Sequence, residues 1–207
     1  MTTSVQFDII PEEKIDAELD RRLVRYLSGL FPEWAHVFAQ ERAWHDARPV
    51  WTTLARSQGE IVGHTAAVER TITTGWNWRY KVASLQGVSV DPEWRNRGIG
   101  RKILDLTLGE ARRRGYPFAI IFCKEPLVPY YRALGWNLPD DSMIMWKDRA
   151  LPIPMRSNCP MFQTLTDLKF PEGPIDVHNP FGFDVLDQVG KTGITPDLRT
   201  KRRYIDE

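Results

Sequence analysis

The chain has 207 residues, of which 42% are hydrophobic and 27% are charged, as in ordinary globular domains. Its 28 Lys and Arg against 27 Asp and Glu leave a net charge of +1, which gives no general attraction to nucleic acid. No apolar run is long enough to span a bilayer, and the N-terminus lacks the pattern of a signal peptide. Two cysteines are too few for a metal cage or a disulfide framework. We therefore expect a cytoplasmic protein with no metal and no nucleic-acid or membrane partner.

The first half of the chain predicts a strand, two helices and an antiparallel meander. In chain order the expected elements are a strand at 5–10, helices at 11–29 and 32–42, and strands at 50–56, 61–73 and 80–90. The turn signals Ser57-Gln58-Gly59-Glu60 and Gly75-Trp76-Asn77 separate the last three strands, so neighbours along the chain should pair antiparallel.

After Asp91 and Pro92 the spacing of apolar residues changes from two to 3.6, which predicts an amphipathic helix that ends at Gly115. The remaining expected elements are a buried strand at 118–123, a short helix at 126–134 and a strand at 142–146. This order predicts an α+β domain over residues 1–148, with a mixed, mostly antiparallel sheet flanked by helices.

Residues 149–207 have a different texture. Frequent prolines forbid long regular elements, and only 161–165 has the pattern of a strand. The segment nevertheless holds several Phe and Leu side chains, which a solvated tail would not retain in such number. We expect a proline-rich C-terminal extension that docks on the domain, with its last residues frayed.

The clearest chemical signal is the strand-to-helix segment 88–101. Gly98 and Gly100 open the helix, where unpaired backbone N–H groups carry a partial positive charge that suits a pyrophosphate. Arg95, Arg97 and Arg101 supply cations for phosphate oxygens. From the residues alone, the alternative is a strand, turn and helix with a basic, solvated rim. A dinucleotide-binding fold fits badly, because the spacing is R-x-x-G-x-G instead of G-x-G-x-x-G.

Arg95-x-x-Gly98-x-Gly100 resembles the pyrophosphate-binding motif of the GNAT superfamily of acyl-CoA-dependent N-acyltransferases. Residues 128–136, VPYYRALGW, resemble the second signature of that superfamily. The two motifs stand in the expected order, and the resemblance covers roughly residues 5–147. It implies a GNAT-like fold, acetyl-CoA or another acyl-CoA as co-substrate, and a small-molecule amine as the acceptor that attacks the thioester directly.

The resemblance also implies site residues. The implied cofactor-binding residues are Val88, Ser89 and Val90, which would pair with the pantetheine arm, and Arg95, Asn96, Arg97, Gly98, Ile99, Gly100 and Arg101 around the diphosphate. Tyr131 occupies the position of the general acid, and its alternative role is packing beside Tyr130, which we expect in the core.

The resemblance identifies the general base less clearly than it identifies the general acid. Gln86 stands where aminoglycoside acetyltransferases have a Glu, and a neutral amide cannot accept a proton. We assign the base to Glu69, with Glu125, or an amine that arrives already neutral, as the alternatives. His64, within an apolar strand, is expected to be a core histidine.

Shorter segments resemble two groups of acyltransferases. Residues 61–70 are similar to the third strand of aminoglycoside 2'-N-acetyltransferases, and residues 47–49 and 170–176 are similar to parts of nodulation-factor N-acyltransferases. Two other functions therefore stay open: transfer of a long acyl chain from CoA or acyl carrier protein, and a catalytically silent CoA-binding sensor. A homodimer is compatible with each of them.

Overall fold

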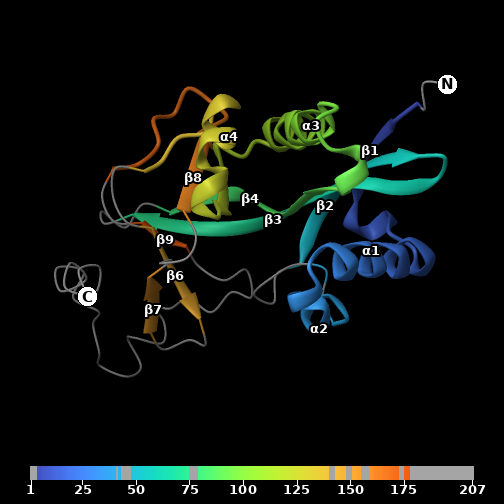
Figure 1. Cartoon of the computed structure of the whole chain (residues 1–207). Coiled ribbons are helices and arrows are strands. Elements are labelled where there is room, and N and C mark those ends of the chain that lie inside the picture. The colour runs from blue at the N-terminus through green and yellow to red at the C-terminus, as the bar shows by residue number, and fades with distance from the viewer. Residues whose placement is uncertain are drawn as a thin grey trace.

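A computed structural model of the chain describes a mixed sheet together with its helices (Figure 1). The described residues are 4–40, 42, 48–74, 79–139, 143–147, 151–154, 159–172 and 175–177. The strands are β1 (Gln6–Pro11), β2 (Pro49–Ser57), β3 (Glu60–Thr74), β4 (Arg79–Val90), β5 (Phe118–Cys123), β6 (Met143–Lys147), β7 (Leu151–Pro154), β8 (Cys159–Thr164) and β9 (Ile175–Val177). The helices are α1 (Ala17–Leu30), α2 (Ala35–Phe38), α3 (Ile99–Arg113) and α4 (Val128–Ala133), with 3-10 turns η1 (Glu12–Lys14), η2 (Pro32–Trp34), η3 (Pro92–Trp94) and η4 (Glu125–Leu127).

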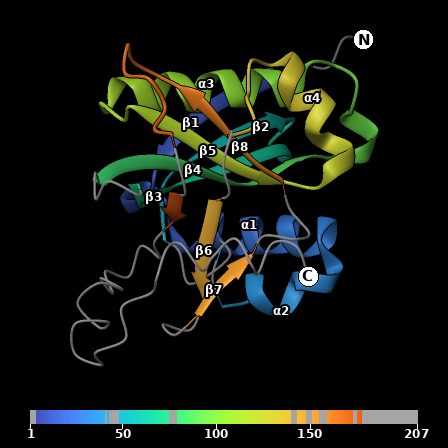
Figure 2. The same ribbon diagram turned by 90° about the vertical axis from the view of Figure 1, so that its left-hand side faces the viewer.

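The sheet runs in the order β7-β6-β9-β3-β4-β5-β8, and β2 pairs with both β1 and β3. The pairs β4–β5 and β6–β9 are parallel, and the other pairs between described strands are antiparallel. Helices α3 and α4 lie on one face of the sheet, and α1 and α2 lie on the other (Figures 1 and 2). The predicted α+β class, a mixed and mostly antiparallel sheet flanked by helices, is confirmed. No helix in the described ranges is long and apolar enough to cross a membrane.

The N-terminal helices are shorter than the sequence predicted. Helix α1 begins at Ala17 instead of Pro11, because the side chain of Asp16 accepts a hydrogen bond from the backbone N–H of Leu19 at 2.8 Å and caps the helix. Residues 12–14 form a separate 3-10 turn before this cap. The helix expected over 32–42 is a 3-10 turn followed by the single turn of α2. The turn predicted at 75–77 lies outside the described residues.

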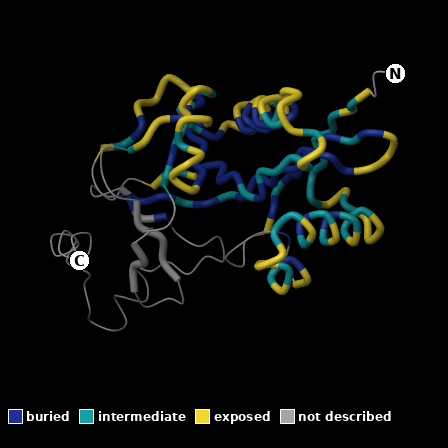
Figure 3. The backbone as a smooth tube through the Cα atoms, viewed as in Figure 1, coloured by how far each residue is buried: buried dark blue, intermediate teal, exposed yellow. Residues whose placement is uncertain are grey.

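The core lies on both faces of the central strands, which are the most buried part of the chain (Figure 3). Leu104 and Leu108 of α3 pack with Ala83, Leu85 and Ile121 on one face. On the other face the side chains alternate as β-strand geometry requires, and Val82, Phe118 and Ile120 form a second cluster. The core is therefore divided by the sheet into an α3 side and an opposite side.

The region beyond residue 148 contributes strands to this sheet. The sequence predicted one strand there, and the structure has β7, β8 and β9. Strand β8 pairs with the whole length of β5, and β9 pairs with residues 72–74 of β3. The prolines misled the prediction, because β7 is an edge strand, where a missing backbone N–H is tolerated. Residues from 178 onward lie outside the described part.

Phe170 connects this region to the side of the sheet opposite α3. Its ring stacks on Phe162 at a centroid distance of 3.7 Å and meets Phe118 edge-on at 5.1 Å. We expect Phe170→Ala to lower the free energy of unfolding by about 3 kcal/mol, because it leaves a cavity against both rings. Leu168→Ala, at a site two residues away that is 52% exposed, should change it by less than about 0.5 kcal/mol. Urea titrations of the three proteins check this, and equal midpoints would show that the segment is not docked.

Candidate active site

Strands β4 and β5 separate at one end of the sheet. They pair only from Ala83–Ala119 to Leu85–Ile121, although β4 continues to Val90 and β5 to Cys123. The separation begins where β4 contains a bulge: its register with β3 shifts between His64 and Ala66, and Gly87 has a φ of +61°. The last residues of β4 therefore have no β5 partner on that side within the described chain. An extended ligand can add to such an edge as a strand would.

The first turn of α3 lies directly after this open edge. The helix begins at Ile99, and Gly98 precedes it in the left-handed conformation with a φ of +75°. Asn96 is also left-handed, with a φ of +61°. The first intrahelical hydrogen bond joins the N–H of Lys102 to the carbonyl of Gly98 at 3.0 Å, so the N–H groups of residues 99–101 precede the hydrogen-bonded ladder. No side chain caps the helix and no acidic residue lies in its first turn, which suits an anion.

The predicted arginines surround this turn. Arg95 donates from Nε to the carbonyl of Val90 at 3.1 Å, and Arg97 donates from Nη2 to the carbonyl of Glu93 at 3.0 Å. Arg101 faces Asp105 at 3.8 Å on the exposed side of α3. Ile99 differs from the other predicted residues, because its side chain is buried in the core and only its backbone can meet a ligand. The residues 95–101 thus form one continuous basic turn.

Gly100 and Tyr130 are in close contact across the gap between α3 and α4. A Cβ atom at residue 100 would lie only 2.8 Å from the hydroxyl oxygen of Tyr130 and 3.5 Å from Val90. Glycine therefore lets the Tyr130 hydroxyl approach the start of α3. The sequence placed Tyr130 in the core, but its side chain is 43% exposed. Its hydroxyl is a group near the basic turn that the sequence did not indicate.

Tyr131 is buried at the same end of the sheet. Its ring meets Tyr130 edge-on at 5.2 Å and Trp136 at 6.1 Å, and it belongs to the core cluster that contains Cys123 at the end of β5. Burial raises the pKa of Tyr131 well above its usual value, with smaller contributions from the Cys123 thiol and the Tyr130 phenol. The phenol thus keeps its proton at neutral pH, and the raised pKa makes it a weaker acid than an exposed tyrosine.

Glu69 lies elsewhere. Its carboxylate accepts a hydrogen bond from the Tyr116 hydroxyl at 2.8 Å and pairs with Lys81 at 2.8 Å. Burial opposes the shift, but these two partners outweigh it and lower the pKa of Glu69, which makes it a weaker base. Glu69 is level with Ala119 of β5, so it is roughly 13 Å along the strands from Cys123 and the Tyr131 end. Its assignment as the base stays a prediction without support from this geometry.

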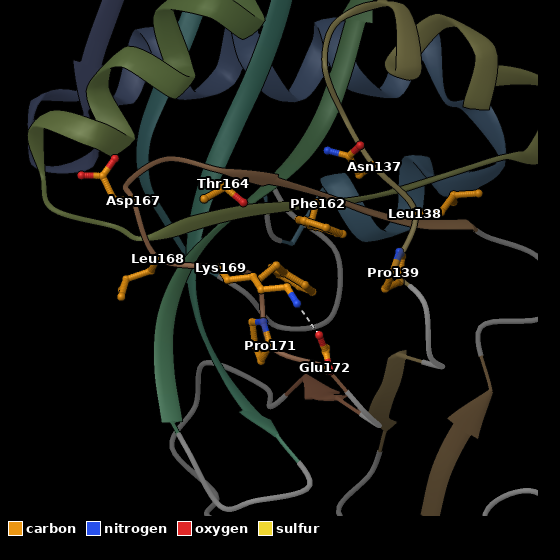
Figure 4. Close-up of a pocket in the computed structure, with 11 residues that line it drawn as sticks. Asn137, Leu138, Pro139, Phe162, Thr164, Asp167, Leu168, Lys169, Pro171 and Glu172 are labelled. Atoms are coloured by element: carbon orange, nitrogen blue, oxygen red, sulfur yellow. Dashed lines mark hydrogen bonds and ion pairs between the residues drawn. The ribbon is translucent and has the colours of Figure 1, made fainter.

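A pocket of about 500 Å³ lies at the β8 edge of the sheet (Figure 4). Its walls come from segments 137–139 and 162–172, including the stacked rings of Phe162 and Phe170. Lys169 and Glu172 line it and form an ion pair with each other. None of the residues predicted to bind CoA lines this pocket, so the candidate active site remains the open end between β4 and β5.

This arrangement agrees with comparisons to known proteins. Residues 28–138 match the family described as "Acetyltransferase (GNAT) domain", which is more than half of the chain. The chain therefore belongs to the GNAT acetyltransferase family. A mycothiol acetyltransferase from Thermobifida fusca (strain YX) is 28% identical over 102 residues, which are 48% of this chain and 32% of that protein. The chain thus spans about a third of the length of this relative.

Solved structures of the family share the fold. YhbS from Escherichia coli, solved in complex with CoA, superposes with a TM-score of 0.54 at 17% identity and covers 88% of this chain and 96% of its own. A GNAT acetyltransferase from Brucella melitensis in complex with acetyl-CoA gives 0.52 at 17% identity, covering 82% and 94%. At these identities the likeness concerns the fold alone.

Proposed function

We propose that this protein transfers an acyl group, acetyl in the first instance, from a coenzyme A thioester to a primary amine of a small molecule. The observation that carries the proposal is the junction of an unpaired β4 edge with the free first turn of α3, next to the protonated phenol of Tyr131. Family membership and relatives solved with CoA or acetyl-CoA support the same donor.

Each part of the donor meets a suitable group at this junction. The diphosphate would accept hydrogen bonds from the N–H groups of residues 99–101, with Arg95, Arg97 and Arg101 as counter-charges. The pantetheine amides would pair with Val88, Ser89 and Val90, which have no β5 partner in the described chain. The thioester would then lie between β4 and β5, close to Tyr131.

The chemistry follows from this placement. The amine nitrogen attacks the thioester carbon, the C–S bond breaks, and the departing thiolate takes a proton from the Tyr131 hydroxyl. The nitrogen of the neutral amine loses one proton, to solvent or through water to the exposed Glu125, which follows β5 in η4. The Tyr131 phenolate then takes a proton from solvent, which completes the cycle. Holding both reactants at one end of the sheet supplies much of the acceleration.

The direct test is incubation of the purified protein with acetyl-CoA and a panel of amines that includes an aminoglycoside, an aliphatic diamine and an amino acid. Release of free thiol should depend on one class of amine, and mass spectrometry should find the N-acetylated product. We expect turnover of about 1 s⁻¹ or more for the correct acceptor. A parallel series of donors from acetyl to long-chain acyl-CoA, together with acyl carrier protein, measures the chain length.

Three results are distinguishable. Transfer only from long-chain donors would replace acetyl in the proposal. Tight binding of CoA without transfer to any amine would indicate a sensor. A protein that binds neither CoA nor acetyl-CoA in calorimetry would refute the proposed function altogether.

A further inference from the structure

The two cysteines of the chain lie directly opposite each other across the β5–β8 ladder (Figure 2). They are the only cysteines in the sequence, and both thiols are free. Opposite residues of a ladder project to the same face of the sheet. Both side chains accordingly pack on the α3 side, with Cys123 inside the core cluster there and Cys159 at its border. The fold thus brings together two thiols that are distant in sequence.

Backbone hydrogen bonds determine the separation of the two Cα atoms. Phe162 exchanges two backbone hydrogen bonds with Asn137, at 2.8 Å and 2.9 Å, so its N–H and C=O point away from β5. These groups alternate in direction along an antiparallel strand, so those of Cys159 point toward β5. Cys123 and Cys159 therefore form a hydrogen-bonded pair, for which the Cα atoms are about 5.5 Å apart. This separation lies within the range of roughly 4.4–6.8 Å that disulfides span.

Only small movements separate the two thiols from a bond. The Cβ atoms of opposite residues are about 4.5–5.5 Å apart and those of a disulfide about 3.5–4.5 Å, so the strands must approach by about 1 Å. Cys123 ends β5 and Cys159 begins β8, so no further described pair of this ladder holds the strands apart. The Sγ atom of Cys123 lies 3.8 Å from the Sδ atom of Met161 on β8, and rotation about its Cα–Cβ bond can turn it toward Cys159.

The two thiols differ in their access to solvent. Cys123 is only 5% exposed, whereas Cys159 is half-buried. Burial raises the pKa of Cys123 to about 11, and the neighbouring Cys159 adds to this shift. A dissolved reagent therefore meets Cys159 first, and Cys123 is the thiol that can resolve the product.

We propose that Cys123 and Cys159 form a reversible intrachain disulfide when the protein meets a low-molecular-weight disulfide, RS–SR. The Cys159 thiolate attacks one sulfur of RS–SR, which gives a mixed disulfide at Cys159 and releases RS⁻. Cys123 then loses its proton to solvent, and its thiolate attacks the Sγ atom of Cys159 and expels the second RS⁻. The two cysteines lose two electrons and two protons, and RS–SR is reduced to two molecules of RSH.

This bond would join the region beyond residue 148 to the sheet beside the candidate active site. Strand β8 belongs to that region, and Cys123 shares its core cluster with Tyr131. The Cys123 thiol also contributes to the raised pKa of Tyr131, so the two groups are close together. Oxidation thus fixes the end of β5 next to the proposed general acid. The inference goes beyond the proposed function and does not depend on it, since the bond forms without acyl donor or amine.

The experiment incubates the reduced full chain with oxidised glutathione and follows intact mass, free thiols and the peptide map. We expect the mass to fall by two hydrogen atoms and the free thiols to fall from two to none. A cross-linked peptide pair should contain Cys123 and Cys159, and dithiothreitol should reverse each change.

Two serine variants are the matched controls. Cys123→Ser keeps the accessible thiol, so it should accumulate one glutathione at Cys159 that no second thiol removes. Cys159→Ser keeps only the buried thiol, so it should react at least about tenfold more slowly than Cys123→Ser. Thermal melting shows whether each variant is folded. A buried thiol that reacts as fast as the half-buried one would contradict the proposed order of steps.

A second measurement needs only the unmodified protein, so it holds even if a serine variant does not fold. The ratio of disulfide to dithiol protein is determined in one glutathione buffer, with and without urea. Because the folded ladder holds the thiols opposite each other, the ratio should be at least about tenfold higher without urea. A ratio that is equal or lower in the folded protein overturns the inference. So does a folded protein that keeps both thiols, stops at the glutathione adduct, or forms a disulfide-linked dimer.

Discussion

Replacement of Tyr131 by phenylalanine is expected to lower turnover by roughly 10²–10⁴-fold and to leave the affinity for acetyl-CoA within about twofold. The substitution removes only the hydroxyl, so the edge-on contacts of the ring with Tyr130 and Trp136 remain. The expected loss follows from the leaving group, because a thiolate that departs without a proton donor is a poorer leaving group. Calorimetry for binding and thiol release for turnover measure the two quantities separately.

The control for this substitution is the adjacent residue on the same helix. Tyr130→Phe also removes one phenolic hydroxyl, but from a ring whose oxygen lies near Gly100 and the start of α3. Its kcat should remain within about threefold of the unmodified protein. Equal turnover in Tyr131→Phe and the parent would mean that solvent or another group protonates the thiolate. A large loss in both variants would point to the packing of α4.

Gly100→Asp is expected to weaken acetyl-CoA binding at least tenfold, a loss of about 1.4 kcal/mol or more. The new side chain places bulk and negative charge at the first turn of α3, where the diphosphate must lie close to the backbone N–H groups. Its Cβ would also meet the Tyr130 hydroxyl at 2.8 Å, so that ring must move. Calorimetric titration with acetyl-CoA measures the effect.

Gly109→Asp is the matched control on the same helix. Residue 109 is exposed, and a Cβ atom there meets nothing within 4 Å, so the variant adds the same charge without a steric clash. Its affinity for acetyl-CoA should stay within about twofold. A folded Gly100→Asp protein with unchanged affinity would remove the α3 turn from the donor site, and an equal loss in both variants would show that net charge alone matters.

The sequence predicted the central elements well because their signals are local. The apolar spacing between Ile99 and Ala111 determines α3, and those side chains are buried in the structure. The two motifs around Gly98 and Tyr131 also led to the correct family, because each motif lies within a few consecutive residues and can be recognised without knowledge of the fold. The pairing of Val88, Ser89 and Val90 with an extended ligand was predicted only through the family resemblance.

The remaining features depend on contacts between distant residues. Glu69 looked like a candidate base in the sequence, but Lys81 and Tyr116, which are distant in sequence, engage its carboxylate. Gly87 within a strand is a signal for a bulge that the sequence analysis did not use, and its contact with His64 is visible only once β3 and β4 are paired. Strand β9 has three residues, too few for a periodic pattern to predict it.

The pairing of β9 with β3 determines when this protein can finish folding during synthesis. Ile72 pairs with Val177, more than 100 residues later, whereas the β4–α3–β5 unit that carries the basic turn is formed by residues close in sequence. At roughly 5–20 residues per second, the ribosome needs about 5–20 s to translate the intervening segment. Once translated, Phe118 and Ile120 lack the cover of Phe170 until that residue is made, and the edges of β3 and β5 stay unpaired until β9 and β8 follow. Nascent chains that include β5 but have not yet reached β9 therefore present an apolar sheet edge, which is the type of surface that chaperones bind.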